Sequence, residues 1–321
     1  MRVLLVRLDG IGDAAVCAPL IAALREAGHE VGVALTTRNA GLFSPNAIVA
    51  QHVLERIPWP AHGSTPESTA RATAEIAAMR YDVALIASEE PEAFALAAGI
   101  PERAGFTTGL ARPVKSLWVR ARTTRTVSRS QRAGGEDAHE AEVLYRLGAG
   151  LVREPQPPAN AARLRPLLLG AEHAGAGNDD SGEQRRVIVQ AGPKWTASGV
   201  PAGVQRASFA RLDAAGARVI AAPSDAEWVR EHLGVAPETF ASLRDWVRAL
   251  ANAAPLVTVD TGAAHVAGMI GVPVVDIFPD AGFERQVRRW RPWASAYRAF
   301  RASDVDGGPG SRFIETVLDG F

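Results

Sequence analysis

The chain has 321 residues, of which 47% are hydrophobic and 22% charged, and its 35 basic residues equal its 35 acidic ones. This composition is typical of a globular protein with room for two domains, and no apolar run reaches the roughly 18 residues that a membrane span needs. Zero net charge gives no overall field toward nucleic acid, and the single cysteine, Cys17, excludes an intrachain disulfide, so we expect a cytoplasmic protein.

The N-terminal segment has the pattern of a strand and a helix joined by a glycine turn. Val3 to Leu8 is predicted to be a buried strand, Asp9 to Gly12 a tight turn, and Asp13 to Ala27 a helix ended by Gly28. Pro19 should kink this helix unless its missing N–H falls in a distorted turn.

The glycine turn weakly matches the dinucleotide-binding fingerprint, because Gly10 to Ala15 reads G-x-G-x-x-A. However, the next predicted strand, Val31 to Leu35, is followed by Thr36 and Thr37, where a nicotinamide ribose would need an acidic residue. This difference disfavours an oxidoreductase.

Strands and helices continue to alternate, which predicts parallel sheets. The predicted elements are strands at Val53 to Ile57 and Val83 to Ala87, and helices at Pro66 to Arg80 and Asp137 to Leu147. Three carboxylates, Glu89, Glu90 and Glu92, follow the second strand. They would repel an anionic acceptor and suit a polyhydroxylated or amino-bearing one, unless they are simply the solvated start of a helix.

An arginine-rich stretch, residues 112 to 132, is predicted to be a loop or a frayed helix. Its charge either meets phosphate on an acceptor or a membrane surface, or lies exposed without a ligand. Two later segments, Pro155 to Pro158 and the polar, glycine-rich Gly175 to Gly182, mark a linker between domains.

The second half repeats the same alternation. Its predicted elements are strands at Val187 to Gln190 and Arg218 to Ala222, and helices at Phe209 to Ala215 and Leu243 to Ala253, the last opened by a Ser242 and Asp245 capping box. The basic and aromatic segment Arg285 to Trp293 is interpreted as a surface helix across a domain cleft, since no RNA motif accompanies it. Lys194, one of two lysines in the chain, is either a phosphate contact or a solvated loop residue.

The clearest local unit, Leu256 to Phe278, predicts a strand, a helix and a second strand. The helix, Ala263 to Ile270, would begin after Asp260 and Thr261 and end at Gly271. Its free N–H groups and positive dipole end suit a phosphate.

The side chains at the start of this helix allow more than one interpretation. Gly262 would let a phosphate approach the backbone, and the Thr261 hydroxyl would add a donor. Asp260 would repel a phosphate, so it either accepts hydrogen bonds from ligand hydroxyls, as on a sugar, or only caps the helix. His265, one turn further on, is either a core residue or a ligand contact.

DTGAAHVAGMIGVPVVDIF, residues 260 to 278, resembles the C-terminal signature of the bacterial heptosyltransferases, glycosyltransferase family nine. The resemblance implies an α/β fold of the GT-B type, with two facing Rossmann-like domains and parallel sheets. It also implies inverting transfer of a heptose from ADP-heptose to a lipopolysaccharide core, without a metal or other cofactor. The expected domains are residues 1–152 for the acceptor, a linker at 153–185, and residues 186–321 for the nucleotide sugar, with the last helix packing back on the N-terminal domain.

The resemblance also assigns roles to residues. Asp13, after Gly12, matches the proposed catalytic base of the family, although a first-turn carboxylate is common without catalysis. Lys194 and Thr196 match the donor-phosphate position. The residue expected to bind the ribose of the donor is either Asp225 or Glu227, and we favour Glu227. The other expected donor contacts are Gly12, Asp260, Thr261, Gly262, Ala263 and His265.

The sequence leaves alternatives open for both the acceptor and the activity. The acidic residues 89 to 92 and the neutral charge leave room for a soluble acceptor, such as an aminocyclitol or a nucleoside. A sugar-nucleotide binding protein without catalysis and a nucleotide-sugar epimerase remain open, the latter recognisable by conversion of the donor without an acceptor. The expected partners are a nucleotide sugar and a saccharide or lipid-linked saccharide, without nucleic acid and with at most peripheral contact at the inner face of the membrane.

Overall fold

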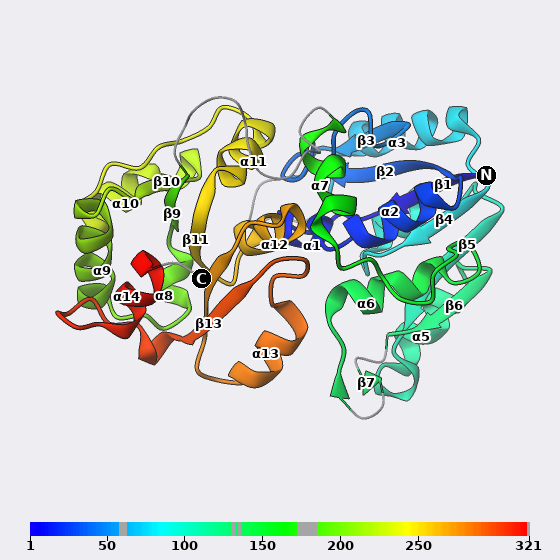
Figure 1. Cartoon of the computed structure of the whole chain (residues 1–321). Coiled ribbons are helices and arrows are strands. Elements are labelled where there is room, and N and C mark those ends of the chain that lie inside the picture. The colour runs from blue at the N-terminus through cyan, green and yellow to red at the C-terminus, as the bar shows by residue number, and fades with distance from the viewer. Residues whose placement is uncertain (58–62, 130–131, 134–135, 172–184, 320–321) are drawn as a thin grey trace. The chain divides into compact units, whose positions relative to one another are not determined.

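The computed structural model describes residues 1–57, 63–129, 132–133, 136–171 and 185–319 (Figure 1). The chain divides into two compact units, Met1–Ala159 and Asn160–Phe321. Each unit contains one parallel sheet with helices packed on it, which confirms the predicted α/β class with parallel sheets. The predicted linker segment Gly175 to Gly182 lies outside the described residues.

The N-terminal unit is built on a six-stranded parallel sheet in the order β3-β2-β1-β4-β5-β6. The strands are β1 (Arg2–Val6), β2 (Glu30–Thr36), β3 (Ala50–Leu54), β4 (Val83–Ile86), β5 (Glu102–Thr107) and β6 (Arg125–Ser128). The helices are α1 (Ile11–Ala15), α2 (Ala18–Glu26), α3 (Pro66–Met79), α4 (Pro91–Leu96), α5 (Pro113–Arg120) and α6 (Glu140–Tyr145), with 3-10 turns η1 (Gly109–Ala111) and η2 (Arg146–Gly148). Short strands β7 (Arg132–Ala133) and β8 (Glu136–Asp137) form an antiparallel pair.

The first predicted helix is broken into α1 and α2. The break falls at Val16 and Cys17, and Pro19 lies in the first turn of α2, where its missing N–H costs no helical hydrogen bond. The distorted turn that Pro19 required is therefore present.

Two elements of the N-terminal unit differ from the prediction. The third strand lies at Ala50–Leu54, earlier than the predicted Val53 to Ile57. The arginine-rich stretch is neither a loop nor a frayed helix, because it forms α5 and the edge strand β6, whose residues pair with β5 from Ala104 to Thr107. The strand was not predicted because its side chains are mostly exposed.

The C-terminal unit is built on a five-stranded parallel sheet in the order β10-β9-β11-β12-β13. The strands are β9 (Arg186–Ala191), β10 (Arg218–Ala221), β11 (Ala253–Val259), β12 (Val274–Phe278) and β13 (Tyr297–Arg301). The helices are α7 (Ala161–Leu169), α8 (Lys194–Ala197), α9 (Ala202–Ala214), α10 (Ala226–Leu233), α11 (Leu243–Ala251), α12 (Gly262–Ile270), α13 (Phe283–Trp290) and α14 (Arg312–Asp319), with 3-10 turns η4 (Pro223–Asp225) and η5 (Ala302–Asp304).

Helix α12 lies in the interior of this unit, as its small, apolar sequence predicts. All residues from Ala263 to Ile270 are buried, and Gly271 ends the helix with φ +80°. A Cβ atom at Gly268 would lie 2.9 Å from Pro292 Cα, so only glycine lets this chain segment approach. Helix α7, inside the expected linker, packs against α12.

The last helix, α14, contributes to the core of the C-terminal unit. Phe313, Ile314 and Val317 are buried in the same apolar cluster as Phe209 of α9. Among the described residues no helix is both long and apolar enough to cross a membrane.

Candidate functional site

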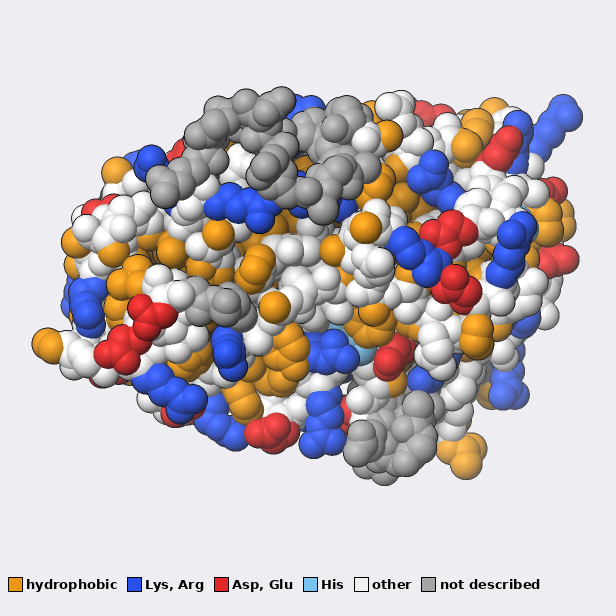
Figure 2. Space-filling model, viewed as in Figure 1, with side chains coloured by type: hydrophobic (Ala, Val, Ile, Leu, Met, Phe, Trp, Pro, Cys, Tyr) orange, Lys and Arg blue, Asp and Glu red, His pale blue; other side chains and the backbone are white. Residues whose placement is uncertain are grey.

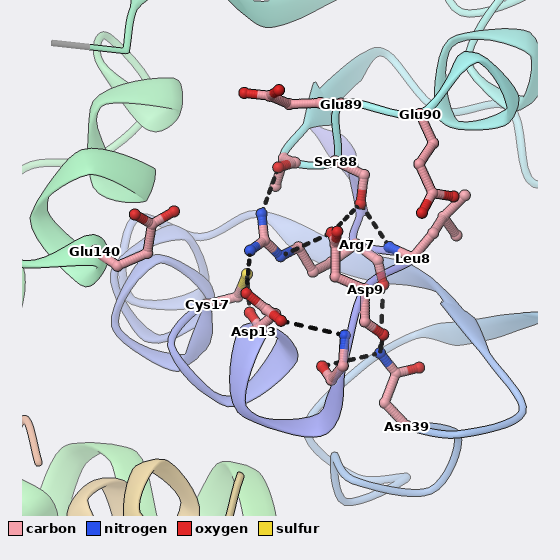
Figure 3. A network of polar contacts seen from close by, with 12 residues as sticks. Arg7, Leu8, Asp9, Asp13, Cys17, Asn39, Ser88, Glu89, Glu90 and Glu140 are labelled. Carbon is pink, nitrogen blue, oxygen red and sulfur yellow. Dashed lines mark hydrogen bonds and ion pairs between the residues drawn. The ribbon is translucent and has the colours of Figure 1, made fainter. Parts of the chain in front are cut away.

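The strand order of the N-terminal sheet reverses between β1 and β4, and polar groups from the loops after these strands meet there. Open α/β sheets bind ligands outside the carboxyl ends of their strands at such a switch point. Arg7 follows β1, and Ala87 and Ser88 follow β4 (Figure 3).

Arg7 is the centre of this network and is only 4% exposed. It donates from Nη2 to Asp13 Oδ1 over 2.7 Å and from Nη1 to the Ala87 carbonyl, and its Nε lies 3.2 Å from Asp9 Oδ2. Burial alone would lower the pKa of Arg7, but Cys17 and the carboxylates around the guanidinium raise it. Arg7 therefore remains charged and fixes both carboxylates.

Asp13 is a fixed but accessible carboxylate. Its Oδ2 accepts from the Gly10 N–H over 3.2 Å, Oδ1 accepts from Arg7, and the side chain remains 35% exposed. A carboxylate has about four lone-pair sites, so each oxygen can still accept a proton from a ligand hydroxyl. The adjacent Gly12 is buried within α1.

A second set of hydrogen bonds fixes the loop between β1 and α1. Ser88 Oγ donates to Asp9 Oδ2 over 2.6 Å and accepts from the Leu8 N–H over 2.7 Å, and Asn39 Nδ2 donates to the Asp9 carbonyl over 3.1 Å (Figure 3). Sequence reasoning missed Arg7, Asp9 and Ser88 as site residues. The available signal was an arginine at the end of an apolar strand, with two carboxylates in the next six positions.

The acidic residues after β4 are paired with cations, which weakens the basis for the expected repulsion of an anionic acceptor. Arg129 Nε lies 3.3 Å from Glu89 Oε1, and Lys115 donates to the other oxygen. Partial burial alone would raise the pKa of Glu89, but these cations and Arg112 lower it. Glu90 and Glu92 pair with Arg56.

In the C-terminal unit the strand order reverses between β9 and β11, and the loops after these strands also meet. Lys194, after β9, donates from Nζ to the carbonyl of Asp260, after β11. The ammonium group therefore lies beside the amino end of α12. Among the described residues, no group of three or more His, Cys, Asp or Glu is placed to hold a metal ion.

Thr261 is the N-cap of α12, and its Oγ1 accepts from the Ala263 N–H over 3.3 Å. Its hydroxyl also lies 2.9 Å from Thr258 Oγ1, which can itself donate to the Val259 carbonyl. When Thr258 donates to Val259, Thr261 donates to Thr258 and must turn from it to donate to a ligand. When Thr258 donates to Thr261, the Thr261 proton can point toward a ligand. Gly262 is partly exposed, which leaves its backbone accessible.

Asp260 and His265 form a pair at the same end of α12. His265 Nε2 lies 3.6 Å from Asp260 Oδ1, and the imidazole, only 6% exposed, packs on Trp290 with ring centroids 5.5 Å apart. His265 is thus a mostly buried residue whose Nε2 lies beside an accessible carboxylate. This arrangement can orient Asp260 toward hydroxyl groups.

The remaining predicted donor residues lie on two neighbouring elements. Thr196, on α8, accepts from Gln205 Nε2 over 3.1 Å. Asp225 lies beside the loop after β9, because a Cβ atom at Gly192 would be 3.1 Å from its Oδ2. Glu227 is exposed on the first turn of α10. The carboxylate of Asp225, one of the two candidate ribose ligands, therefore lies near the loop that carries Lys194.

Sequence reasoning did not single out Asp276, which lies in β12 beside Thr258 of β11. It is fully buried, and both carboxyl oxygens lack a hydrogen bond within the described structure. Burial, and then the charge of Asp260, raise the pKa of Asp276 well above its ordinary value, although Lys194 opposes the shift. The signal was a lone carboxylate within the apolar run VVDIF.

No family model and no curated protein matches the sequence. Solved structures match over most of the chain. ADP-heptose lipopolysaccharide heptosyltransferase II of E. coli is 15% identical, with a TM-score of 0.67 and coverage of 99% of this chain and 98% of that one. E. coli heptosyltransferase WaaC with ADP is 19% identical, with a TM-score of 0.63 and coverage of 99% and 97%. A glycosyl transferase family 9 protein of Veillonella parvula is 17% identical, with a TM-score of 0.66 and coverage of 94% and 86%.

The chain has the fold of the family-nine glycosyltransferases. The GT-B fold expected from residues 260 to 278 is confirmed over nearly the full length. Each unit of this fold places polar side chains at its own switch point: the Arg7 and Asp13 network in the first unit, and Lys194 with the amino end of α12 in the second.

Proposed function

We propose that the chain is an inverting glycosyltransferase that moves a sugar from a nucleotide-sugar donor to an acceptor hydroxyl. The observation that carries the proposal is the position of Lys194 Nζ at the Asp260 carbonyl, where α12 begins. A lysine and a helix amino end together form a site for a diphosphate.

The donor half-site would stabilise the leaving group. Lys194, the Thr261 hydroxyl and the amides of Gly262 and Ala263 would take the charge that develops on the diphosphate, and Thr196 would assist them. Removal of one such preorganised donor typically costs about 3 to 4 kcal/mol of barrier. Asp260, oriented by His265, would accept hydrogen bonds from the sugar.

The acceptor half-site would supply the base. Asp13 would take the proton of the acceptor hydroxyl as that oxygen attacks the anomeric carbon, while the bond to the diphosphate breaks in the same displacement. Arg7 and the Gly10 amide hold the carboxylate in one orientation, so that little reorganisation is needed. Gly12, buried in α1, would contact the donor through its backbone.

We further propose ADP-heptose as the donor and a lipopolysaccharide core as the acceptor, without a metal or other cofactor, at the cytoplasmic side of the membrane. The support is the ADP bound in the E. coli WaaC structure and the name of the similar E. coli enzyme, ADP-heptose lipopolysaccharide heptosyltransferase II. The ion pairs of Glu89, Glu90 and Glu92 remove an objection to a phosphorylated acceptor. For the ribose we propose Glu227 or Asp225.

The test is calorimetric titration of the purified protein with ADP, GDP, UDP and dTDP. We expect selective binding of ADP, weakened about 10- to 100-fold in Lys194→Ala, since a hydrogen bond to a charged group contributes about 1.5 to 3 kcal/mol. The chain offers a matched control in Lys115→Ala, which removes its other lysine and should leave ADP binding unchanged.

The titration can also contradict the proposal in two ways. Selective binding of a nucleotide with another base would support a glycosyltransferase but contradict ADP-heptose as its donor. Absence of binding to all four nucleotides, or equal effects of the two lysine variants, would refute the phosphate site.

A further inference from the structure

The short helix α5 and the turn η1 before it expose apolar side chains to solvent. Leu110 is 95% exposed, Val114 80% and Leu117 65%. Only six large hydrophobic residues are exposed among those that the structure describes, and three of them lie between positions 110 and 117. Such clustering marks an interaction surface, whereas single exposed apolar residues are ordinary.

Helix α5 presents apolar side chains on its solvent face, where a surface helix normally presents polar ones. Ser116 and Val119 are buried against the sheet, with α5 beside β5 and β6 at the sheet edge (Figure 1). At about 100° per residue, Val114 and Leu117 lie on the opposite face of the helix. Leu110 lies on η1, just before α5, and is the most exposed of the three, so one short segment presents all three apolar side chains, here called the apolar strip.

The surroundings of this strip are basic. Residues 103 to 135 contain seven arginines and one lysine but no acidic residue, in a chain whose net charge is zero. Arg112 and Lys115 contact Glu89, but Arg120, Arg122 and Arg125 have no ion pair within the described structure. Arg122 instead lies over the Trp118 ring at 4.1 Å, and Arg125 donates to the Leu147 carbonyl.

The other exposed large hydrophobic residues of the described structure, Met1, Val49 and Leu318, lie far from this strip in the sequence. Blue and red side chains are interspersed over the face seen in Figure 2. Leu318, another exposed apolar residue, lies on α14 beside Asp319. An apolar strip with unpaired arginines next to it is complementary to a lipid surface that is apolar inside and anionic outside.

We propose that η1 and α5 form a docking element for anionic membrane surfaces. Leu110, Val114 and Leu117 enter the headgroup boundary, and Arg120 and Arg122 lie among the anionic headgroups. The element works without nucleotide or acceptor, so it does not rest on the proposed transferase activity. It would place the N-terminal unit at a membrane, where a lipid-linked acceptor is found.

The experiment is sedimentation of the full chain with vesicles of phosphatidylcholine alone and of phosphatidylcholine mixed with phosphatidylglycerol, without nucleotide. We expect binding to the anionic vesicles only, weakened by added salt. Leu110→Ser with Leu117→Ser should lower the binding at least tenfold. Arg120→Gln with Arg122→Gln should lower it about 25-fold, since each basic residue near such a surface contributes about fivefold.

Matched controls separate docking from misfolding. Leu318→Ser and Arg206→Gln change exposed residues of the same kinds in the C-terminal unit and should bind vesicles like the unchanged chain. All variants should keep the same thermal unfolding midpoint, because the substituted side chains are exposed.

Three results would overturn the proposal. The first is equal binding of the Leu110 and Leu117 variant and the unchanged chain. The second is no sedimentation with anionic vesicles. The third is self-association without lipid that Leu117→Ser abolishes, which would assign the strip to a second copy of the chain. Loss of nucleotide binding would bear only on the transferase proposal.

Discussion

The buried carboxyl of Asp276 makes the stability of the C-terminal unit depend on pH in an unusual direction. Its two oxygens are fully buried and without hydrogen bonds in the described structure, and its pKa is raised by burial and by Asp260. The perturbation is Asp276→Asn, which keeps the shape of the side chain but removes its titration.

The sign follows from proton uptake. In the unfolded chain an aspartate loses its proton near pH 3.9, whereas the folded chain holds the proton to a higher pH. Between these two values unfolding releases a proton, so stability is greatest at low pH and falls as pH rises, by about 1.4 kcal/mol per pH unit. Asp276→Asn should be free of this loss.

The assay is thermal unfolding of both proteins between about pH 5 and pH 8, with the exposed Asp304→Asn as control. The advantage of Asp276→Asn should grow with pH, and each kcal/mol should shift its midpoint upward by about 2 to 4 °C for a unit of this size. A difference in stability between Asp276→Asn and the unchanged chain that does not change with pH would refute the reasoning, because Asp276 would then not keep its proton in the folded chain.

Three further outcomes are expected. Asp13→Asn should reduce sugar transfer by about 10² to 10⁴ and leave ADP binding intact; near-normal turnover would exclude Asp13 as the base. Cys17 is buried, and burial, with help from Asp13, raises the pKa of its thiol to about 12, so iodoacetamide should alkylate it only after unfolding, as mass spectrometry would detect. Gly268→Ala should cost about 1 to 3 kcal/mol in chemical denaturation because its Cβ would meet Pro292, whereas Gly203→Ala, with free space around it, should not; equal effects would contradict the packing argument.

The unit from Leu256 to Phe278 could be predicted because its signals are local. An apolar run, a threonine cap and a glycine with φ +80° each specify their own part of the backbone. The proximity of Lys194 and Asp260, 66 positions apart, needed the additional rule that parallel strands end at one edge of a sheet.

Other features depend on residues that are distant in the sequence, and a local sequence pattern cannot identify these partners. Strand β6 has exposed side chains and is a strand because β5 offers it a free edge. The charge of Glu92 is matched by Arg56, 36 positions earlier, and the acidic segment alone does not reveal this partner. Roles such as that of Asp13 came from the family resemblance and stay predictions.

Helix α7 determines where this chain can be divided or recombined. Its Leu164, Leu167 and Leu168 are buried, and the helix packs on α12, although the domain pattern of the sequence would start the second domain only at residue 186. A C-terminal fragment cut at residue 186 would lack α7 and expose the apolar side of α12 to solvent. A fragment or chimaera should therefore be joined at residues 159 and 160, so that each C-terminal unit carries its own α7.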